Sequence, residues 1–185
     1  MVSSRHCEAL GCAIPGRRFL LLLQPVFDAS GWRHTSIRRN DGKLCPILIT
    51  EKKNQGTNDL RQAEGKERQA KGNAIERLGK NVIGFRTAML GESIFPFVCF
   101  GDGCDFSEGS SILDRVVTIA MFGRLNKENL HNQGMNGLIN RGSFYFRPEE
   151  WTVSEMRDIC HGIAEKSIYY YFSRHGKSSF SATSA

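Results

Sequence analysis

The sequence PILITEKK at residues 46–53 decides the fold of this chain. Its apolar run Ile47-Leu48-Ile49 is unbroken, which is typical of a strand covered on both faces. The turn signal Asn40-Asp41-Gly42 precedes it and favours a type I′ hairpin turn, which needs residues that tolerate positive φ. We therefore predict a hairpin, with a short strand around Ile37 and a return strand over residues 43–53.

A helix pattern follows the sequence GNAIER at residues 72–77. Apolar residues recur there at steps of three and four, the spacing of an amphipathic helix. These residues are Ile75, Leu78, Val82, Phe85 and Met89. Gly91 comes next and suits a C-terminal cap, and residues 95–100 form a further apolar strand. Because strand, long helix and strand make a crossover unit, residues 46–53 and 95–100 are expected to be parallel neighbours.

The remaining chain adds further elements to this unit. Residues 112–122 are apolar and fit either a helix or a strand, and residues 143–147 alternate as a short strand. Thr152 and Glu155 form a capping box, which predicts a helix from there to about Phe172. The sequence therefore indicates an α/β fold with a mixed sheet flanked by helices.

Composition is that of one soluble domain. The 185 residues suffice for a sizeable core. The net charge of +6 favours a polyanionic partner without requiring one. Six cysteines occur without a CxxC pair, as expected of reduced cytoplasmic thiols rather than a zinc site. The apolar run at residues 19–23 is too short for export or for spanning a membrane, so no membrane partner is expected.

The charged end of the return strand suits metal-dependent chemistry. Strand alternation puts Glu51 and Lys53 on one side, with Lys52 opposite. A carboxylate can hold Mg²⁺, and a neighbouring lysine can orient a water or stabilise charge on phosphorus, while the metal activates the nucleophile. The alternative is a surface ion pair at a strand end, because such tripeptides are common.

The helix start suits DNA recognition. A helix N-terminus favours nearby phosphate. Asn73 can pair with adenine and Arg77 with guanine, each through two hydrogen bonds. They lie four residues apart on one helix face, and Glu76 can accept from a base or hold Arg77 in position. The alternative is an ordinary helix start, with Asn as the cap and solvated charges after it.

Three segments together resemble the EcoRI family of type II restriction endonucleases in order and spacing. They are ILITEKKNQG at residues 47–56, GNAIER at residues 72–77 and FPFV at residues 95–98. The resemblance implies a restriction-endonuclease-like PD-(D/E)xK core that hydrolyses double-stranded DNA with Mg²⁺ and leaves a 5′-phosphate. It also implies a homodimer on a short palindrome such as GAATTC, paired with a DNA methyltransferase in a prokaryotic cytoplasm.

The resemblance also assigns roles to residues. Glu51 and Lys53 are the implied catalytic pair, with Glu51 as the metal ligand and the Lys52 carbonyl as a further ligand. The segment Gly123-Arg124-Leu125-Asn126 resembles a further recognition segment of the family. The implied DNA-binding residues are Asn73, Ala74, Glu76, Arg77 and Arg124.

The chain departs from the family before this stretch. The family has a metal-binding Asp in a Pro-Asp-Gly-Gly context, roughly twenty residues before the glutamate. The sequence here reads Ser30-Gly31-Trp32-Arg33-His34, and the nearest acids are Asp28 and Asp41. These five residues can be encoded by TCC GGA TGG CGG CAT. One base further on, the same bases encode Pro-Asp-Gly-Gly, with the Asp codon straddling Gly31 and Trp32.

We therefore hypothesise that residues 1–34 are translated out of frame. Residues 35–174 would then form the catalytic and recognition domain, followed by a disordered tail at residues 175–185. Two alternatives to an active enzyme stay open. One is a catalytically dead remnant that still binds its DNA site, and the other is a basic scaffold protein unrelated to DNA.

Overall fold

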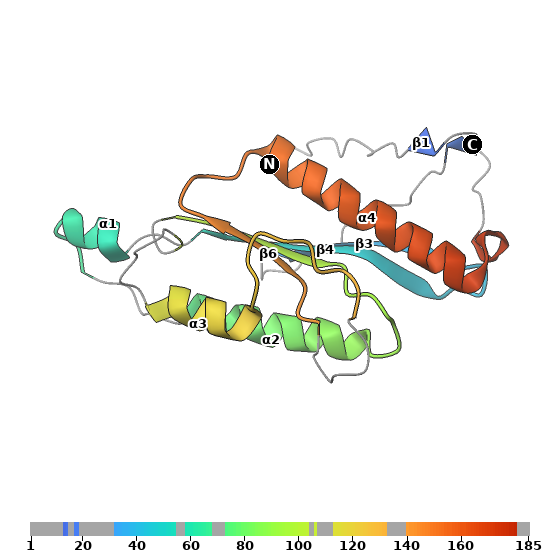
Figure 1. Ribbon diagram of the computed structural model, residues 1–185, viewed down its shortest axis with the longest axis horizontal. Coiled ribbons are helices and arrows are strands. Elements are labelled where there is room, and N and C mark those ends of the chain that lie inside the picture. The colour runs from blue at the N-terminus through green and yellow to red at the C-terminus, as the bar shows by residue number, and fades with distance from the viewer. Residues whose placement is uncertain are drawn as a thin grey trace, which may run out of the picture.

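The computed structural model describes residues 13–14, 17–18, 32–54, 58–67, 73–103, 106, 113–132 and 140–180. Three layers are visible, with a sheet between helices α2 and α3 on one face and α4 on the other (Figure 1). The predicted α/β fold with a mixed sheet is confirmed. The elements are β1 (Ala13–Ile14), β2 (Arg17–Arg18), β3 (Trp32–Arg38), β4 (Leu44–Asn54), α1 (Asn58–Ala63), α2 (Asn73–Ala88), β5 (Phe97–Asp102), α3 (Leu113–Phe122), β6 (Ser143–Arg147), α4 (Val153–His175) and the 3₁₀ helix η2 (Lys177–Ser179).

The main sheet has the strand order β3-β4-β5-β6. Strands β3 and β4 are antiparallel, whereas β4 pairs with β5, and β5 with β6, in parallel. The crossover β4-α2-β5 therefore matches the predicted unit. Every residue of β5 is buried, as expected for a central parallel strand between two helical layers.

The hairpin forms as predicted, but its turn type differs. Arg39 N donates to Lys43 O at 2.9 Å, and Lys43 N donates to Asp41 Oδ1 at 3.0 Å. Gly42 alone has a positive φ in this turn, +85°, whereas a type I′ turn needs two such residues. The prediction of type I′ was therefore wrong. A loop in which one left-handed glycine closes the hairpin satisfies the same strand twist.

A β-bulge in β4 sets the orientation of the charged residues. The register shifts between Thr35 and Ser36 and leaves Ile47 without a partner on β3. Before the bulge, Cys45 and Ile47 pack into the core beneath α4; after it, Ile49 packs into the core beneath α2. Because the bulge changes the phase of alternation, the following odd-numbered residues of β4 face α2.

Helix α2 buries the predicted apolar stripe against the sheet. Ile75, Leu78, Val82 and Met89 are buried. The helix ends at Ala88, and Gly91 has no positive φ, so the predicted glycine cap was wrong. The end is instead closed by the Arg86 guanidinium, whose Nη1 donates to Met89 O at 2.8 Å.

The C-terminal elements close the second layer. Residues 113–122 are helical, and the Thr152–Glu155 capping box is present. Helix α4 continues three residues beyond Phe172, to His175. Beyond it η2 forms and Phe180 is buried against the α4 core, so this segment is structured where a disordered tail was expected. Residues 181–185 lie outside the described part of the chain.

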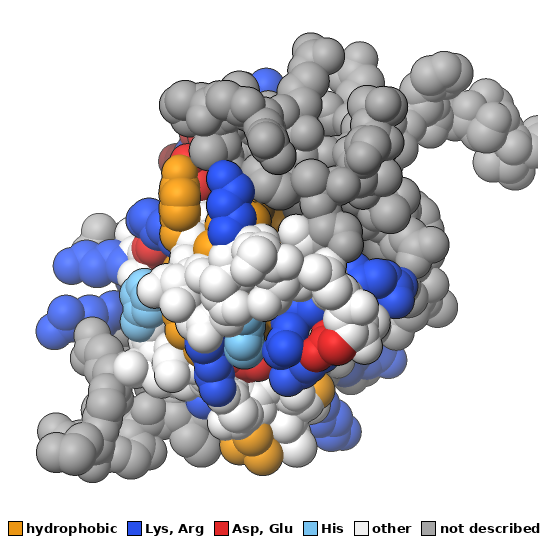
Figure 2. Space-filling model, turned by 90° about the vertical axis from the view of Figure 1, so that its right-hand side faces the viewer, with side chains coloured by type: hydrophobic (Ala, Val, Ile, Leu, Met, Phe, Trp, Pro, Cys, Tyr) orange, Lys and Arg blue, Asp and Glu red, His pale blue; other side chains and the backbone are white. Residues whose placement is uncertain are grey.

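One end of the molecule, at the right of Figure 1, carries the hairpin turn and the C-terminal end of α4. Figure 2 shows Lys, Arg and His side chains gathered on it. Three of its basic residues are paired: Arg39 with Asp41 at 2.8 Å, and Arg174 and Lys43 with Glu92 at 2.8 and 3.8 Å. This basic surface lies at the start of β4, away from the charged residues at its other end. Within the described residues, no helix has both the length and the apolar character to cross a membrane.

Candidate active site

Glu51 and Lys53 form a buried ion pair at the carboxyl end of β4. Lys53 Nζ lies 2.6 Å from Glu51 Oε1, and the Glu51 side chain is 0% exposed. Both residues follow the bulge and therefore share the face that carries α2, so the predicted placement on one side is observed. A solvated ion pair at a strand end was the alternative, and burial of the carboxylate excludes it.

The two oxygens of Glu51 have different surroundings. Oε1 accepts from Lys53 Nζ and also from Asn81 Nδ2, at 3.1 Å. Oε2 is buried and has no hydrogen-bond partner. An unsatisfied buried carboxylate oxygen costs free energy, so Oε2 is the atom at which a cation or a donor would be stabilised. Asn81 was not predicted from the sequence, although a polar side chain beside the apolar stripe of α2 was the available signal.

The remaining groups near Glu51 offer few further ligands. The β5 partner of Glu51 is Cys99. Burial raises the pKa of the Cys99 thiol well above its usual value, and the charge of Glu51 raises it further. The thiol therefore stays protonated. The β3 partner of Glu51 is Trp32, a residue type without an oxygen ligand. No cluster of three or more His, Cys, Asp or Glu residues that could hold a metal occurs within the described ranges.

Of the two acids nearest in sequence to the missing aspartate, Asp41 does not join this site. Asp41 lies in the hairpin turn at the other end of β4, paired with Arg39 at 2.8 Å. Asp28 is outside the described residues. The described site therefore holds one carboxylate, whereas Mg²⁺ binds in proteins through one or two carboxylates together with water and substrate phosphate.

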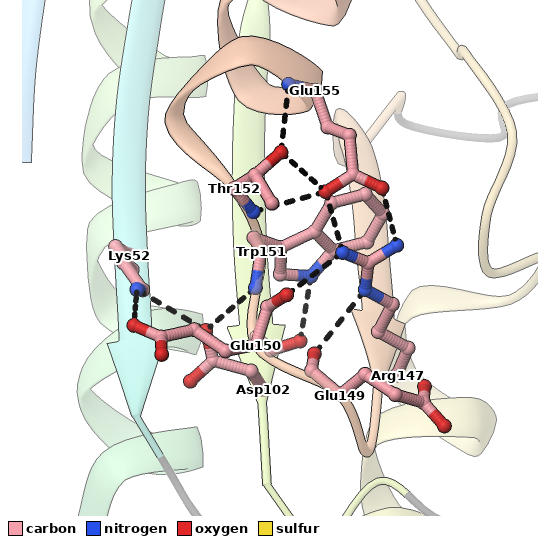
Figure 3. Close-up of polar contacts among 9 residues, drawn as sticks. Lys52, Asp102, Arg147, Glu149, Glu150, Trp151, Thr152 and Glu155 are labelled. Carbon is pink, nitrogen blue, oxygen red and sulfur yellow. Dashed lines mark hydrogen bonds and ion pairs between the residues drawn. The ribbon is translucent and has the colours of Figure 1, made fainter.

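Lys52 points to the opposite face, as predicted, and enters a separate polar cluster (Figure 3). Its Nζ lies 3.2 Å from Asp102 Oδ2 and 3.7 Å from Glu150 Oε1. Asp102 is buried, and its Oδ2 also accepts from Trp151 N at 3.4 Å. This cluster holds the Lys52 side chain on the α4 side, away from Glu51 and Lys53.

The same cluster fixes the start of α4 on the sheet (Figure 3). Arg147, the last residue of β6, stacks over the Trp151 ring at 3.8 Å and pairs with both oxygens of Glu155, at 2.8 and 2.6 Å. Trp151 Nε1 donates to Gly101 O at 3.0 Å. Two-pronged Arg–carboxylate pairs are directional, so the carboxyl ends of β4, β5 and β6 are tied to the start of one helix.

Replacing Glu155 by Gln should flatten the acid limb of the stability profile. The hydrogen bonds from Arg147, and next those from Thr152, lower the Glu155 pKa from 4.5 to about 2. A lowered folded-state pKa contributes stability that is complete above the unfolded-state value and is lost as the pH falls from 4.5 towards about 2. Urea unfolding across this range measures it, with Glu165→Gln on the same helix as control. Equal pH slopes in wild type and Glu155→Gln would contradict the prediction.

The recognition residues begin α2, at the same end of the helix layer as the candidate metal site (Figure 1). Asn73 and Ala74 are its first two residues, and Glu76 and Arg77 are exposed on its first turns. Glu76 pairs with Lys80 at 2.6 Å and not with Arg77, which corrects one predicted role. The hydrogen bond from Lys80 and its charge lower the Glu76 pKa.

Arg124 lies on a different segment, after α3. It is exposed. Two residues further on, Asn126 has a φ of 59° and clamps β6: its Nδ2 donates to Phe146 O at 3.1 Å, and Phe146 N donates to its Oδ1 at 2.8 Å. The segment that carries Arg124 is therefore anchored to the sheet.

A mixed sheet with a buried Glu-x-Lys pair at the carboxyl end of its second strand defines an α/β domain of the restriction-endonuclease-like class. The family described as "Restriction endonuclease EcoRI" matches residues 33–112. Over these residues the chain is similar to the EcoRI family.

Two curated relatives support the assignment. The chain is 28% identical over 169 residues to the type II restriction enzyme RsrI of Cereibacter sphaeroides, covering 72% of this chain and 60% of that protein. It is 32% identical over 115 residues to the type II restriction enzyme EcoRI of Escherichia coli, covering 54% of this chain and 42% of that protein. The chain therefore spans about half the length of the curated relatives that it matches.

Proposed function

We propose that this chain is a type II site-specific deoxyribonuclease, which hydrolyses double-stranded DNA with Mg²⁺ at a short GAATTC-like palindrome and leaves a 5′-phosphate. The observation that carries the proposal is the buried Glu51 carboxylate, with one oxygen paired to Lys53 and the other without a partner. Paired acid and base at a strand end, together with the exposed Glu76 and Arg77 in the first turns of α2, suit phosphodiester chemistry on DNA.

Each residue of the pair has a defined task. Glu51 would hold Mg²⁺ through Oε2, with the Lys52 carbonyl as an additional ligand. When bound, the ion supplies polarisation of the phosphoryl oxygen and activation of water. Lys53 is kept close to the reacting phosphate by its 2.6 Å contact with Glu51. Its ammonium orients the attacking water and stabilises the negative charge that builds on the phosphate.

The DNA would lie across the start of α2. Asn73, Ala74, Glu76 and Arg77 would contact base edges, with the helix N-terminus near phosphate. Arg124 would add a base or phosphate contact from the segment after α3. The exposure of Glu76, Arg77 and Arg124 supports this arrangement, because contacts with DNA need accessible side chains.

A homodimer would match the two-fold symmetry of a palindrome. Helices α2 and α3 pack closely where Met121 approaches Gly79; a Cβ on this glycine would be 3.7 Å from Met121 Cε. Both helices carry exposed apolar side chains, among them Ile83, 67% exposed, and Val116, 61% exposed. These exposed apolar side chains are the surface that we propose a second copy covers.

Val116→Glu should therefore dissociate the dimer, because a two-fold axis would bring the new charge against its own copy or bury it. The matched control is Val153→Glu, the same substitution at a 79% exposed position on α4, the other face of the sheet. Sedimentation velocity measures the result. A monomeric wild type, or a Val116→Glu variant that stays dimeric, would contradict this interface.

Incubation of a plasmid with the protein and Mg²⁺ tests the function. Discrete fragments that end in a 5′-phosphate at one palindromic sequence are expected, and EDTA should prevent them. A specific gel shift without cleavage would instead favour the second candidate, a DNA-binding remnant; the single carboxylate of the described site supports that candidate. In a cell, the active form would need a DNA methyltransferase to protect the host genome, and it would act in the prokaryotic cytoplasm.

A further inference from the structure

We infer that Asn81 is a positioning residue that couples helix α2 to the Glu51 carboxylate. This inference rests on the proposed function, since it links the helix proposed to read DNA to the carboxylate proposed to hold the metal. Its basis is the hydrogen bond from Asn81 Nδ2 to Glu51 Oε1, 3.1 Å long, between residues thirty positions apart in the sequence.

The hydrogen bond fixes the direction of the free oxygen. Glu51 Oε1 is already held by Lys53 Nζ at 2.6 Å, and Asn81 supplies a second donor to the same atom. Lysine is a point charge on a flexible stem and sets no single orientation of the carboxylate plane. The amide of Asn81 comes from a rigid helix, so it defines the rotation of the carboxylate and with it the position of Oε2.

The helix connects this contact to the recognition residues. Arg77 and Asn81 are four residues apart in α2, so they lie one turn apart, about 6 Å along the axis, on the same side. Helix α2 is held to the sheet by the buried Leu78 and Val82 on either side of Asn81. A shift of the first turn on binding DNA is therefore transmitted to the Asn81 amide and on to Glu51.

The coupling between DNA and metal tests this role. We expect a cation that binds at Glu51 to raise affinity for the cognate duplex in the wild type, by about tenfold, within the usual range of coupling between sites. Asn81→Ala should reduce this factor to below about twofold, while metal-free affinity for the duplex stays near the wild-type value. Ca²⁺, which binds through oxygen ligands, is the probe, and fluorescence anisotropy of a labelled duplex is the measurement.

The matched control is Thr87→Ala in the same helix. Thr87 is exposed, and its Oγ1 donates to Ile83 O at 2.8 Å, so the control also loses one side-chain hydrogen bond but one that stays within α2. It should keep the full coupling factor. A merely structural role of Asn81 predicts equal coupling in the two variants, and that result would overturn the inference.

Hydrogen exchange separates failure of this inference from failure of the proposed function. In the wild type and in Thr87→Ala, metal-free cognate DNA should slow amide exchange both in the first turn of α2 and at residues 51–53. In Asn81→Ala, the DNA should slow exchange in the first turn of α2 but not at residues 51–53. If wild-type α2 shows no protection by DNA, the proposed function fails. In that case, amide exchange in the DNA-free proteins tests the inference about Asn81. Faster exchange at residues 51–53 in Asn81→Ala than in Thr87→Ala supports the contact between Asn81 and Glu51, and equal exchange rates overturn it.

Discussion

Replacing Glu51 by Gln should reduce Mg²⁺-dependent cleavage by about 1,000-fold or more, the size of loss seen when a group that acts on the transition state is removed. Gln keeps the volume of the side chain but removes the charge that would hold a cation at Oε2. Affinity for the cognate duplex without metal should change little, because Glu51 is fully buried under α2 and the proposed DNA contacts lie elsewhere.

The control for this experiment is Glu150→Gln. Glu150 lies near the same end of the sheet but is 82% exposed and contacts Lys52 on the opposite face. The Glu150→Gln variant should cleave the plasmid at the wild-type rate. Initial cleavage rates of a supercoiled plasmid compare the three proteins, and thermal unfolding confirms that each is folded. A wild-type cleavage rate of Glu51→Gln would contradict the proposal that Glu51 is catalytic.

Replacing Trp32 by Asp should strengthen metal binding and cleavage by about 10- to 100-fold, the scale on which supporting groups alter metal sites. The backbone of position 32 pairs with Glu51, and an Asp directly opposite its partner in an antiparallel pair is within reach of that partner. An Asp there would supply the second carboxylate that the described site lacks. Mn²⁺ affinity by calorimetry and plasmid cleavage rates are the measurements.

Trp32→Asn is the matched control, because it changes the size of the side chain in the same way without adding charge. If Trp32→Asp and Trp32→Asn both increase metal affinity and cleavage rate, the cause is the smaller side chain and not a new ligand. The absence of a gain in Trp32→Asp would show that position 32 does not reach the metal site.

The same register supports our proposal that residues 1–34 are out of frame. In the shifted frame the Asp codon would straddle Gly31 and Trp32, beside the position opposite Glu51. The family match begins at residue 33, next to this point. The coding DNA decides the matter, since codons for residues 30–34 that do not give Pro-Asp-Gly-Gly one base on would exclude the proposal.

Local patterns in the sequence were enough to predict most elements. The hairpin, the separate patterns of β4, α2 and β5, and the capping box of α4 depend on residues at most a few positions apart, and backbone periodicity records them directly. The Glu51–Lys53 pair followed from alternation within one strand. The helical state of residues 113–122 stayed open, because an apolar run of this length suits either a helix or a strand.

By itself, the sequence determined most of the main elements, their order and the placement of Glu51 and Lys53 on one side of their strand. Only the tertiary structure decided which helix this pair faces, because the bulge at Ile47 reverses the alternation of β4 and depends on its register with β3. It also decided the contacts of Asn81 with Glu51 and of Lys52 with Asp102. Those residues are thirty and fifty positions apart, and folding alone brings them together.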